Sequence, residues 1–154
     1  MQNNILISPS ILAADFMNLG EEINNVIKAG ADMIHIDVMD NHYVPNMSMG
    51  PAICHSIQNK NISVPMDVHL MVSPVDDAIK AFAKAGAHYI TIHPDATINL
   101  NRSINLIKGL GCKVGLAIKP NHDLNIIKNC VHEIDLLLIM SVNPGFGGQK
   151  FIDS

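Results

Sequence analysis

The sequence predicts an α/β fold in which helices cover a parallel sheet, and three observations support this. Short apolar runs alternate along the chain with amphipathic segments of about ten residues. Hydrophobic residues make up 48% of the 154 residues and charged residues only 16%, as expected for strands buried on both faces. The segment 28–36 (KAGADMIHI) is echoed at 84–92 (KAGAHYITI), so one structural unit recurs.

Apolar runs and turn residues place the elements in order. The expected strands are 5–8, 33–38, 66–70, 89–93, 113–118 and 136–140. The expected helices are 19–29, 51–59, 74–85, 99–110 and 123–130. Pro51 and Pro74 suit a first helical turn, and three glycines stand where helices end: Gly30, Gly86 and Gly111.

The recurring unit and the position of the polar residues favour a (β/α)8 TIM barrel. Such barrels carry their chemistry at the carboxyl ends of the strands, where Asp37, His69 and His93 fall. The sixth strand is followed only by residues 141–154, whereas an eight-stranded barrel needs about 200 residues or more. We therefore expect a single barrel domain over 1–154, C-terminally truncated after about six strands and lacking the last two βα units. An open doubly wound sheet is the alternative.

Composition excludes several classes of partner. A net charge of −4 with interspersed signs argues against nucleic acid and anionic membranes. No apolar run approaches the ~18 residues of a membrane span, and the first residues lack a signal-peptide pattern. The three cysteines have no short metal-binding spacing, which favours a reducing, cytoplasmic location.

Two of the expected strands each carry a histidine and an aspartate two residues apart. Side chains two apart on a strand share a face, so His35 projects with Asp37, and Asp67 with His69. Converging imidazole and carboxylate groups suit a divalent metal, which would take His35, Asp37 and His69. The alternative is a set of core residues that satisfy one another. Asp67 either accepts the second ring N–H of His69 or is a buried residue lower in the barrel.

A glycine-rich loop, residues 143–149 (NPGFGGQ), follows the last expected strand. Glycines let backbone N–H groups approach an anion, so this loop is either a phosphate cradle or a flexible turn. It lacks the lysine spacing of a nucleotide-binding P-loop, which disfavours nucleotides.

Other residues at strand ends allow two interpretations. Met39, Met71 and Met140 are either adaptable core filling or an apolar lid over a substrate. Ser10 could reach a substrate hydroxyl or satisfy a turn. His93 is a possible substrate contact, although a structural role is favoured.

Four motifs resemble the ribulose-phosphate 3-epimerase family, in register from residue 5 to the end of the chain. They are SPSILAADF at 8–16, HIDVMD at 35–40, DVHLM at 67–71 and MSVNPGFGGQ at 140–149. The resemblance implies a barrel of the ribulose-phosphate-binding type. It also implies an isomerase of the pentose phosphate pathway that interconverts D-ribulose 5-phosphate and D-xylulose 5-phosphate. The implied reaction is a metal-assisted 1,1-proton transfer through an enediolate.

The resemblance also implies roles for individual residues. His35, Asp37 and His69 would bind one divalent metal, Zn²⁺ or Fe²⁺ first and Mn²⁺ or Co²⁺ as possibilities, with Asp37 also catalytic. The implied contacts to a phosphorylated ketopentose are Ser10, His69, Gly145, Phe146, Gly147 and Gly148. The implied apolar cap is Met39, Met71 and Met140. The full-length protein would be a homo-oligomer.

The chain also departs from the family pattern. The family's strand-seven aspartate, in a V-D-G-G context, and its strand-eight G-S phosphate contacts have no counterpart in these 154 residues. We therefore expect the chain by itself to be inactive or nearly so. Two other interpretations are a 3-epimerase of a related ketose phosphate, such as allulose 6-phosphate, and a non-catalytic remnant.

Overall fold

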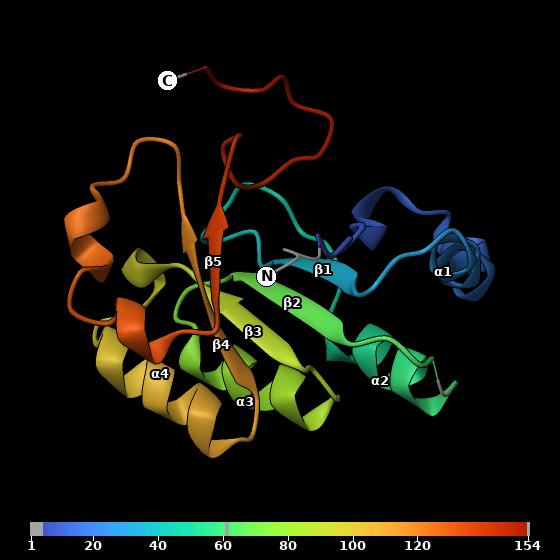
Figure 1. The fold of residues 1–154 in the computed structure, drawn as a ribbon, viewed down its shortest axis with the longest axis horizontal. Helices are drawn as coiled ribbons and strands as arrows, with labels where there is room; N and C mark the ends of the chain where they lie inside the picture. The colour runs from blue at the N-terminus through green and yellow to red at the C-terminus, as the bar shows by residue number, and fades with distance from the viewer. Residues whose placement is uncertain (1–4, 61, 154) are drawn as a thin grey trace.

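The computed structural model describes residues 5–60 and 62–153 and contains one parallel sheet (Figure 1). The strands follow the sheet in chain order: β1 Ile34–Met39, β2 Met66–Met71, β3 Tyr89–Ile92, β4 Lys113–Ile118 and β5 Leu136–Ile139. The helices are α1 Leu19–Lys28, α2 Pro51–Asn59, α3 Asp76–Lys84 and α4 Leu100–Gly109. All four strand pairs are parallel. The predicted α/β class is therefore confirmed.

Most helix ends follow the predicted turn chemistry, but Pro74 lies before α3, which begins at Asp76, and not in its first turn. Pro51 occupies the first turn of α2, where its missing N–H has no helical partner to lose. Gly30, Gly86 and Gly111 all have positive φ just beyond α1, α3 and α4, as a C′ glycine does.

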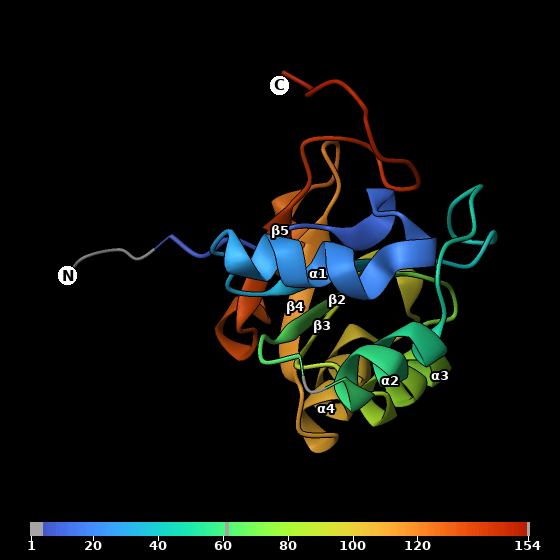
Figure 2. The same ribbon diagram turned by 90° about the vertical axis from the view of Figure 1, so that its right-hand side faces the viewer.

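The strand order decides between the two architectures that the sequence allowed. A doubly wound sheet reverses its order at a switch point, whereas β1 to β5 follow one another without reversal. Helices α2, α3 and α4 lie side by side on one face of the sheet (Figure 1). The segment after β5 extends beyond the carboxyl end of the sheet (Figure 2). These features are those of consecutive units of a (β/α) barrel.

The prediction of a first strand at 5–8 is wrong, because these residues form no strand. The segment does lie beside β1, where the carbonyl of Ile7 accepts hydrogen bonds from the N–H groups of Asp32 and Met33. Pro9 has no N–H to give to a ladder, and only an isolated bridge between Ser10 and His35 follows. The chain then turns through two short 3₁₀ helices, Ile11–Ala13 and Phe16–Asn18.

The helix predicted at 123–130 is also wrong, because the chain forms two 3₁₀ turns there, Leu124–Ile127 and Val131–Glu133. The Asp123 side chain accepts a hydrogen bond from the N–H of Asn125, which favours a tight turn over an α-helix. The first turn buries Ile127 in the core, but with 4 and 3 residues the two turns are much shorter than α2 to α4, which have 9 or 10. Among the described residues, no helix has the length and apolar character needed to cross a membrane.

The two faces of the sheet differ in chemistry. The helix-covered face is apolar: Ile36, Val68, Ile90 and Leu116 are fully buried against α2–α4. The opposite face carries polar side chains that line up across the strands, with Asp37 beside His69, His69 beside Thr91 and Thr91 beside Gly115. A Cβ at position 115 would overlap the Thr91 hydroxyl, so the close approach of β3 and β4 requires glycine there.

Candidate metal centre and cavity

The site is built on adjacent residues of β1 and β2. His35 pairs in register with Asp67, and Asp37 pairs with His69, so four polar side chains leave the same face at two neighbouring levels. The strands themselves remain buried because their intervening residues, such as Ile36 and Val68, pack under the helices.

The three predicted ligands come together. His35 Nε2 lies 3.3 Å from Asp37 Oδ1, and His69 Nδ1 lies 3.1 Å from the same oxygen. The ligand atoms of the three residues all lie within 4.8 Å of one another. Two imidazole nitrogens and a carboxylate oxygen at this spacing are a donor set that one divalent cation can bind. The chemistry of the donors therefore fits the metal that the sequence led us to expect.

Asp67 serves His35, not His69. The His35 Nδ1–H donates to Asp67 Oδ2 over 2.7 Å, while no contact joins Asp67 to the His69 ring among the described residues. The hydrogen bond orients the His35 ring with Nε2 toward Asp37. Of the two sequence interpretations of Asp67, the hydrogen bond with His69 is wrong, and the structure supports a buried residue lower in the barrel, which hydrogen-bonds to His35.

The second nitrogen of the His69 ring faces another histidine. His69 Nε2 lies 2.9 Å from His93 Nε2, and both rings are buried. His93 follows β3, one residue beyond its last strand residue, Ile92. It lies behind His69 and does not line the cavity described below, so the structural interpretation of His93 fits its position.

The site is electrostatically coupled. Burial disfavours the imidazolium of His35, but hydrogen bonds with Asp37 and Asp67 outweigh burial and raise its pKa to about 10. Burial opposes ionisation of Asp37, yet His35, His69 and Ser10 hold the pKa of its carboxyl well below the usual range. Burial lowers the pKa of His69, and burial next to His69 lowers the pKa of His93 to about 3. The His35 imidazolium therefore occupies the position of positive charge that a metal would take.

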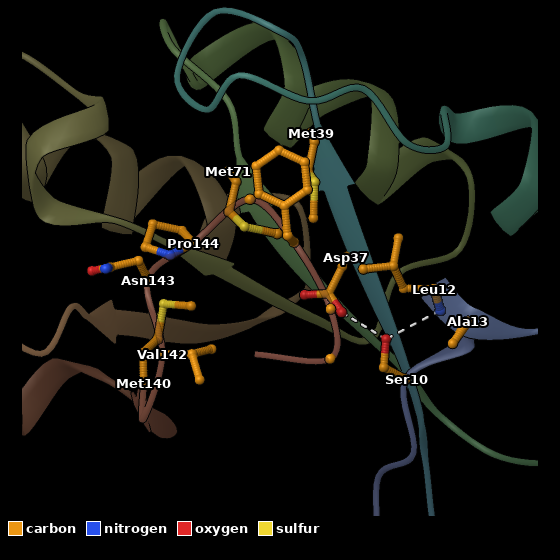
Figure 3. Close-up of a pocket in the computed structure, with 14 residues that line it drawn as sticks. Ser10, Leu12, Ala13, Asp37, Met39, Met71, Met140, Val142, Asn143 and Pro144 are labelled. Atoms are coloured by element: carbon orange, nitrogen blue, oxygen red, sulfur yellow. Dashed lines mark hydrogen bonds between the residues drawn. The ribbon is translucent and has the colours of Figure 1, made fainter. Parts of the chain in front are cut away.

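A cavity of about 460 Å³ opens beside the site at the carboxyl ends of the strands (Figure 3). Asp37 reaches it with one carboxylate oxygen, because Oδ1 faces the two imidazoles while Oδ2 accepts a 2.6 Å hydrogen bond from the Ser10 hydroxyl. Ser10 also caps the following 3₁₀ turn through the N–H of Leu12. The turn role considered for Ser10 is thus confirmed, while its contact to a substrate hydroxyl stays a prediction.

The cavity also brings together the predicted cap and the glycine-rich loop. Its lining includes Met39, Met71, Met140 and residues 143–148. Figure 3 shows the three methionines around the space next to Asp37. His69 is only 1% exposed and does not line the cavity, so a direct substrate contact for it stays a prediction.

Two side chains that hold the glycine-rich loop through three hydrogen bonds were not found from the sequence. The Asn46 side-chain amide donates to the Gly145 carbonyl over 2.8 Å, and the Gln149 amide donates to the carbonyls of Asn143 and Phe146. Gly145 has φ 123°, and a Cβ there would lie 3.3 Å from the Val44 side chain. No local signal indicates the Asn46 contact, because it joins loops 99 residues apart.

The sequence also gave no indication of a polar cluster around Asp95. The Tyr43 hydroxyl donates to Asp95 Oδ1 over 2.7 Å, and Lys119 Nζ donates to Asp95 Oδ2 over 2.6 Å. The Tyr43 ring centroid lies 5.1 Å from that of His93. The loop after β1 is therefore anchored over the buried histidine pair. The Asp40 side chain accepts hydrogen bonds from the N–H groups of residues 42 and 43 and so forms an Asx-type turn. An aspartate in this position is a sequence pattern from which the turn in this loop could have been predicted.

Comparison with known proteins identifies relatives along the whole chain. The model of the Ribulose-phosphate 3 epimerase family matches residues 6–154. The ribulose-phosphate 3-epimerase of Buchnera aphidicola subsp. Acyrthosiphon pisum is 59% identical over 152 residues, covering 99% of this chain and 67% of the relative. Those of Serratia marcescens and Escherichia coli K12 are 55% and 52% identical, covering 96% of this chain and 70% and 65% of the relatives. The chain thus spans about two thirds of their length.

Solved structures that resemble this chain share its fold at low sequence identity. Tryptophan synthase subunit alpha from Legionella pneumophila matches with a TM-score of 0.59 at 13% identity, covering 88% of this chain and 61% of that one. Yersinia pestis DHPS matches with a TM-score of 0.59 at 16% identity, covering 92% and 59%. The structural neighbours are (β/α) barrel proteins, so the five-stranded sheet corresponds to part of such a barrel.

Proposed function

Because this chain belongs to the ribulose-phosphate 3-epimerase family, we propose that it carries the metal-binding half of the centre that interconverts D-ribulose 5-phosphate and D-xylulose 5-phosphate. The observation that supports this most directly is the position of Asp37. One of its oxygens faces both imidazoles, and the other faces Ser10 at the cavity wall. A carboxylate in that position can hold a cation and exchange a proton with a substrate.

The reaction inverts a carbon next to a ketone. A proton leaves one face of the substrate and another arrives on the opposite face, so two acid/base groups must flank a planar enediolate. Asp37 takes the role of one of them. Its pKa lies well below the usual range, so it rests as a carboxylate.

His35, Asp37 and His69 would hold the metal. When bound, the metal supplies a Lewis acid that stabilises the negative oxygens of the enediolate. Two imidazoles with carboxylate favour Zn²⁺ or Fe²⁺ and also accept Mn²⁺ or Co²⁺. Asp67 positions His35 for this role through the 2.7 Å hydrogen bond to its Nδ1–H.

The cavity offers room for a phosphorylated ketopentose, the substrate class that we propose. Its phosphate would lie against the backbone of residues 145–148, where glycines allow close approach. Met39, Met71 and Met140 would cover the apolar edge of the bound sugar and keep water from the enediolate. We also propose a cytoplasmic location, the pentose phosphate pathway as the setting, and homo-oligomers for the full-length protein.

We further propose that a polypeptide of these 154 residues is inactive or nearly so as an epimerase. Among the described residues that line the cavity, Asp37 is the one carboxylic acid, and the other polar side chains are the hydroxyl of Ser10 and the amide of Asn143. Proton exchange on one face of the substrate remains open to Asp37. No second carboxylic acid among these residues could donate a proton to the opposite face of the substrate.

Deuterium incorporation separates these steps. Zn²⁺-loaded chain is incubated in D₂O with each sugar phosphate, and deuterium at C3 is followed by NMR together with the appearance of the epimer. We expect slow exchange into one of the two epimers with little epimer formed, and no exchange with the Asp37→Asn variant. Equal exchange with that variant would exclude Asp37 as the proton carrier, and rapid epimerisation by wild type would overturn the one-sided assignment.

A further inference from the structure

The buried contact between His69 and His93 lies outside the chemistry assigned so far. Their Nε2 atoms are 2.9 Å apart, their ring centroids are 5.0 Å apart, and the rings are inclined by 41°. His69 is 1% and His93 0% exposed, so neither nitrogen can turn to water for another partner. A polar pair this deeply buried is costly unless its hydrogen bond is made.

The contact constrains where protons can lie. Two neutral imidazoles form one N–H···N bond when one of the facing nitrogens carries a proton and the other offers its lone pair. A cation bound to His69 requires the Nδ1 lone pair, so the proton of that ring must lie on Nε2. His93 must then accept through its own Nε2, and its proton lies on Nδ1. By accepting a hydrogen bond at Nε2, His93 can therefore stabilise the form of His69 that a metal binds.

The His93 ring is itself held in place. Its centroid lies 5.1 Å from that of Tyr43, with the rings inclined by 37°. Tyr43 is tethered in turn by the hydrogen bond from its hydroxyl to Asp95, which is anchored by Lys119. Among the described residues, His93 Nδ1 has no hydrogen-bond partner, so His69 is the group that gives this buried ring its polar contact.

We propose that His93 is a positioning residue that holds His69 with Nδ1 directed at the metal and its proton on Nε2. This inference rests on the metal site of the proposed function. His93 does for His69 what Asp67 does for His35, so each histidine ligand has a separate hydrogen-bond partner on the neighbouring strand or just after it. Such partners are known to orient metal-bound histidines.

The test compares three variants of the 154-residue chain by Zn²⁺ affinity, measured against a competing chelator. His93→Leu removes the acceptor at similar volume, and we expect it to weaken binding ~10–100-fold, the usual effect of losing such a partner. His93→Gln places an amide oxygen near the former Nε2 and should stay near wild type. Thr91→Val is the matched control, since Thr91 lies on β3 two residues before His93, is equally buried and has no hydrogen-bond partner among the described residues.

A spectroscopic measurement accompanies the affinities. Long-range ¹H–¹⁵N spectra of histidine-labelled, Zn²⁺-loaded protein report which ring nitrogen of His69 carries a proton. We expect a protonated Nε2 in wild type, in the glutamine variant and in the Thr91→Val control, and loss or displacement of that signal in His93→Leu.

The outcomes separate the two proposals. Wild-type affinity and an unchanged His69 signal in His93→Leu would overturn the positioning role and leave the metal site intact. A wild-type chain that binds no Zn²⁺ would overturn the metal site and this inference with it. If His93→Leu does not fold, His93→Gln decides: retained affinity and Nε2–H signal support the role, and weak binding by folded protein overturns it.

Discussion

The two faces of the sheet have opposite chemistry although they alternate along the same strands. On β3, Ile90 points into the apolar layer under the helices, while its neighbour Thr91 points to the face that carries the histidines and aspartates. The helix-covered face gains its free energy from buried apolar area, which does not depend on the direction of individual contacts. The polar face depends on pairing, because each buried imidazole or carboxylate needs a specific partner. Alternate residues of the same strand therefore serve different purposes: one set stabilises the fold, and the other forms the candidate site.

Replacing neighbouring residues on β3 tests this separation with the largest expected effect. We expect Ile90→Ala to lower the free energy of unfolding by about 2–5 kcal/mol, because it empties space in the apolar layer. Thr91→Val should leave that free energy nearly unchanged or raise it slightly, since it keeps the shape of the side chain and removes a buried hydroxyl that has no partner in the described part of the chain. Urea unfolding followed by circular dichroism measures both, and equal losses would contradict the separation.

Substitutions on the polar face should have the opposite effect: they should weaken metal binding more than they lower the stability of the fold. Asp37→Asn removes the negative charge beside both imidazoles and replaces one carboxylate oxygen by an amide NH₂, so it should weaken Zn²⁺ binding by more than the ~10–100-fold typical of an outer partner. Chelator competition measures the loss, and circular dichroism checks that the sheet persists. A variant that binds Zn²⁺ like wild type would place the metal elsewhere.

Asp67→Asn should have a smaller effect on the same site. The amide still faces His35 Nδ1 but loses the negative charge that favours and orients the ring, so we expect Zn²⁺ affinity to fall ~10–100-fold. The pKa of His35 should also fall from about 10, because the Asp67 carboxylate helps to raise it. Histidine NMR titration measures that shift, and an unchanged pKa would show that Asp37 alone sets it.

Metal affinity should also depend on pH, and the change per pH unit is the smallest of the expected effects. In the metal-free chain the raised pKa of His35, about 10, keeps this ring protonated at neutral pH, so a metal must displace a proton. Affinity should therefore fall as pH falls, by about tenfold per unit below pH 10, because one His35 proton leaves for each metal bound. Affinity that stays flat between about pH 7 and 9 would contradict the assignment of His35 as a ligand.

The sequence predicted the parts of the molecule that depend on local pattern. Strands β2 and β4 and the glycine ends of α1, α3 and α4 follow from apolar runs and from the left-handed backbone that glycine adopts easily. The convergence of His35, Asp37 and His69 was predictable because side chains two apart share a face and parallel strands align their carboxyl ends.

The features that the sequence did not predict depend on the register between strands and on residues far apart in the chain. Whether Asp67 faces His35 or His69 is decided by how β1 and β2 align, which no single strand encodes. The His69–His93 contact and the Asn46–Gly145 contact likewise need the tertiary structure. The segments 5–8 and 123–130 were assigned from apolar content alone, and Pro9 and the Asp123 cap overrode it.

X-ray absorption at the zinc edge of the Zn²⁺-loaded chain tests the central claim most directly. We expect one Zn²⁺ per chain with two imidazole nitrogens at ~2.0–2.1 Å and the remaining ligands oxygen. All three cysteines are buried and none belongs to the metal group, so no sulfur should appear. Zinc bound through sulfur at ~2.3 Å, or no stoichiometric zinc at all, would contradict the assignment of this face as a metal centre.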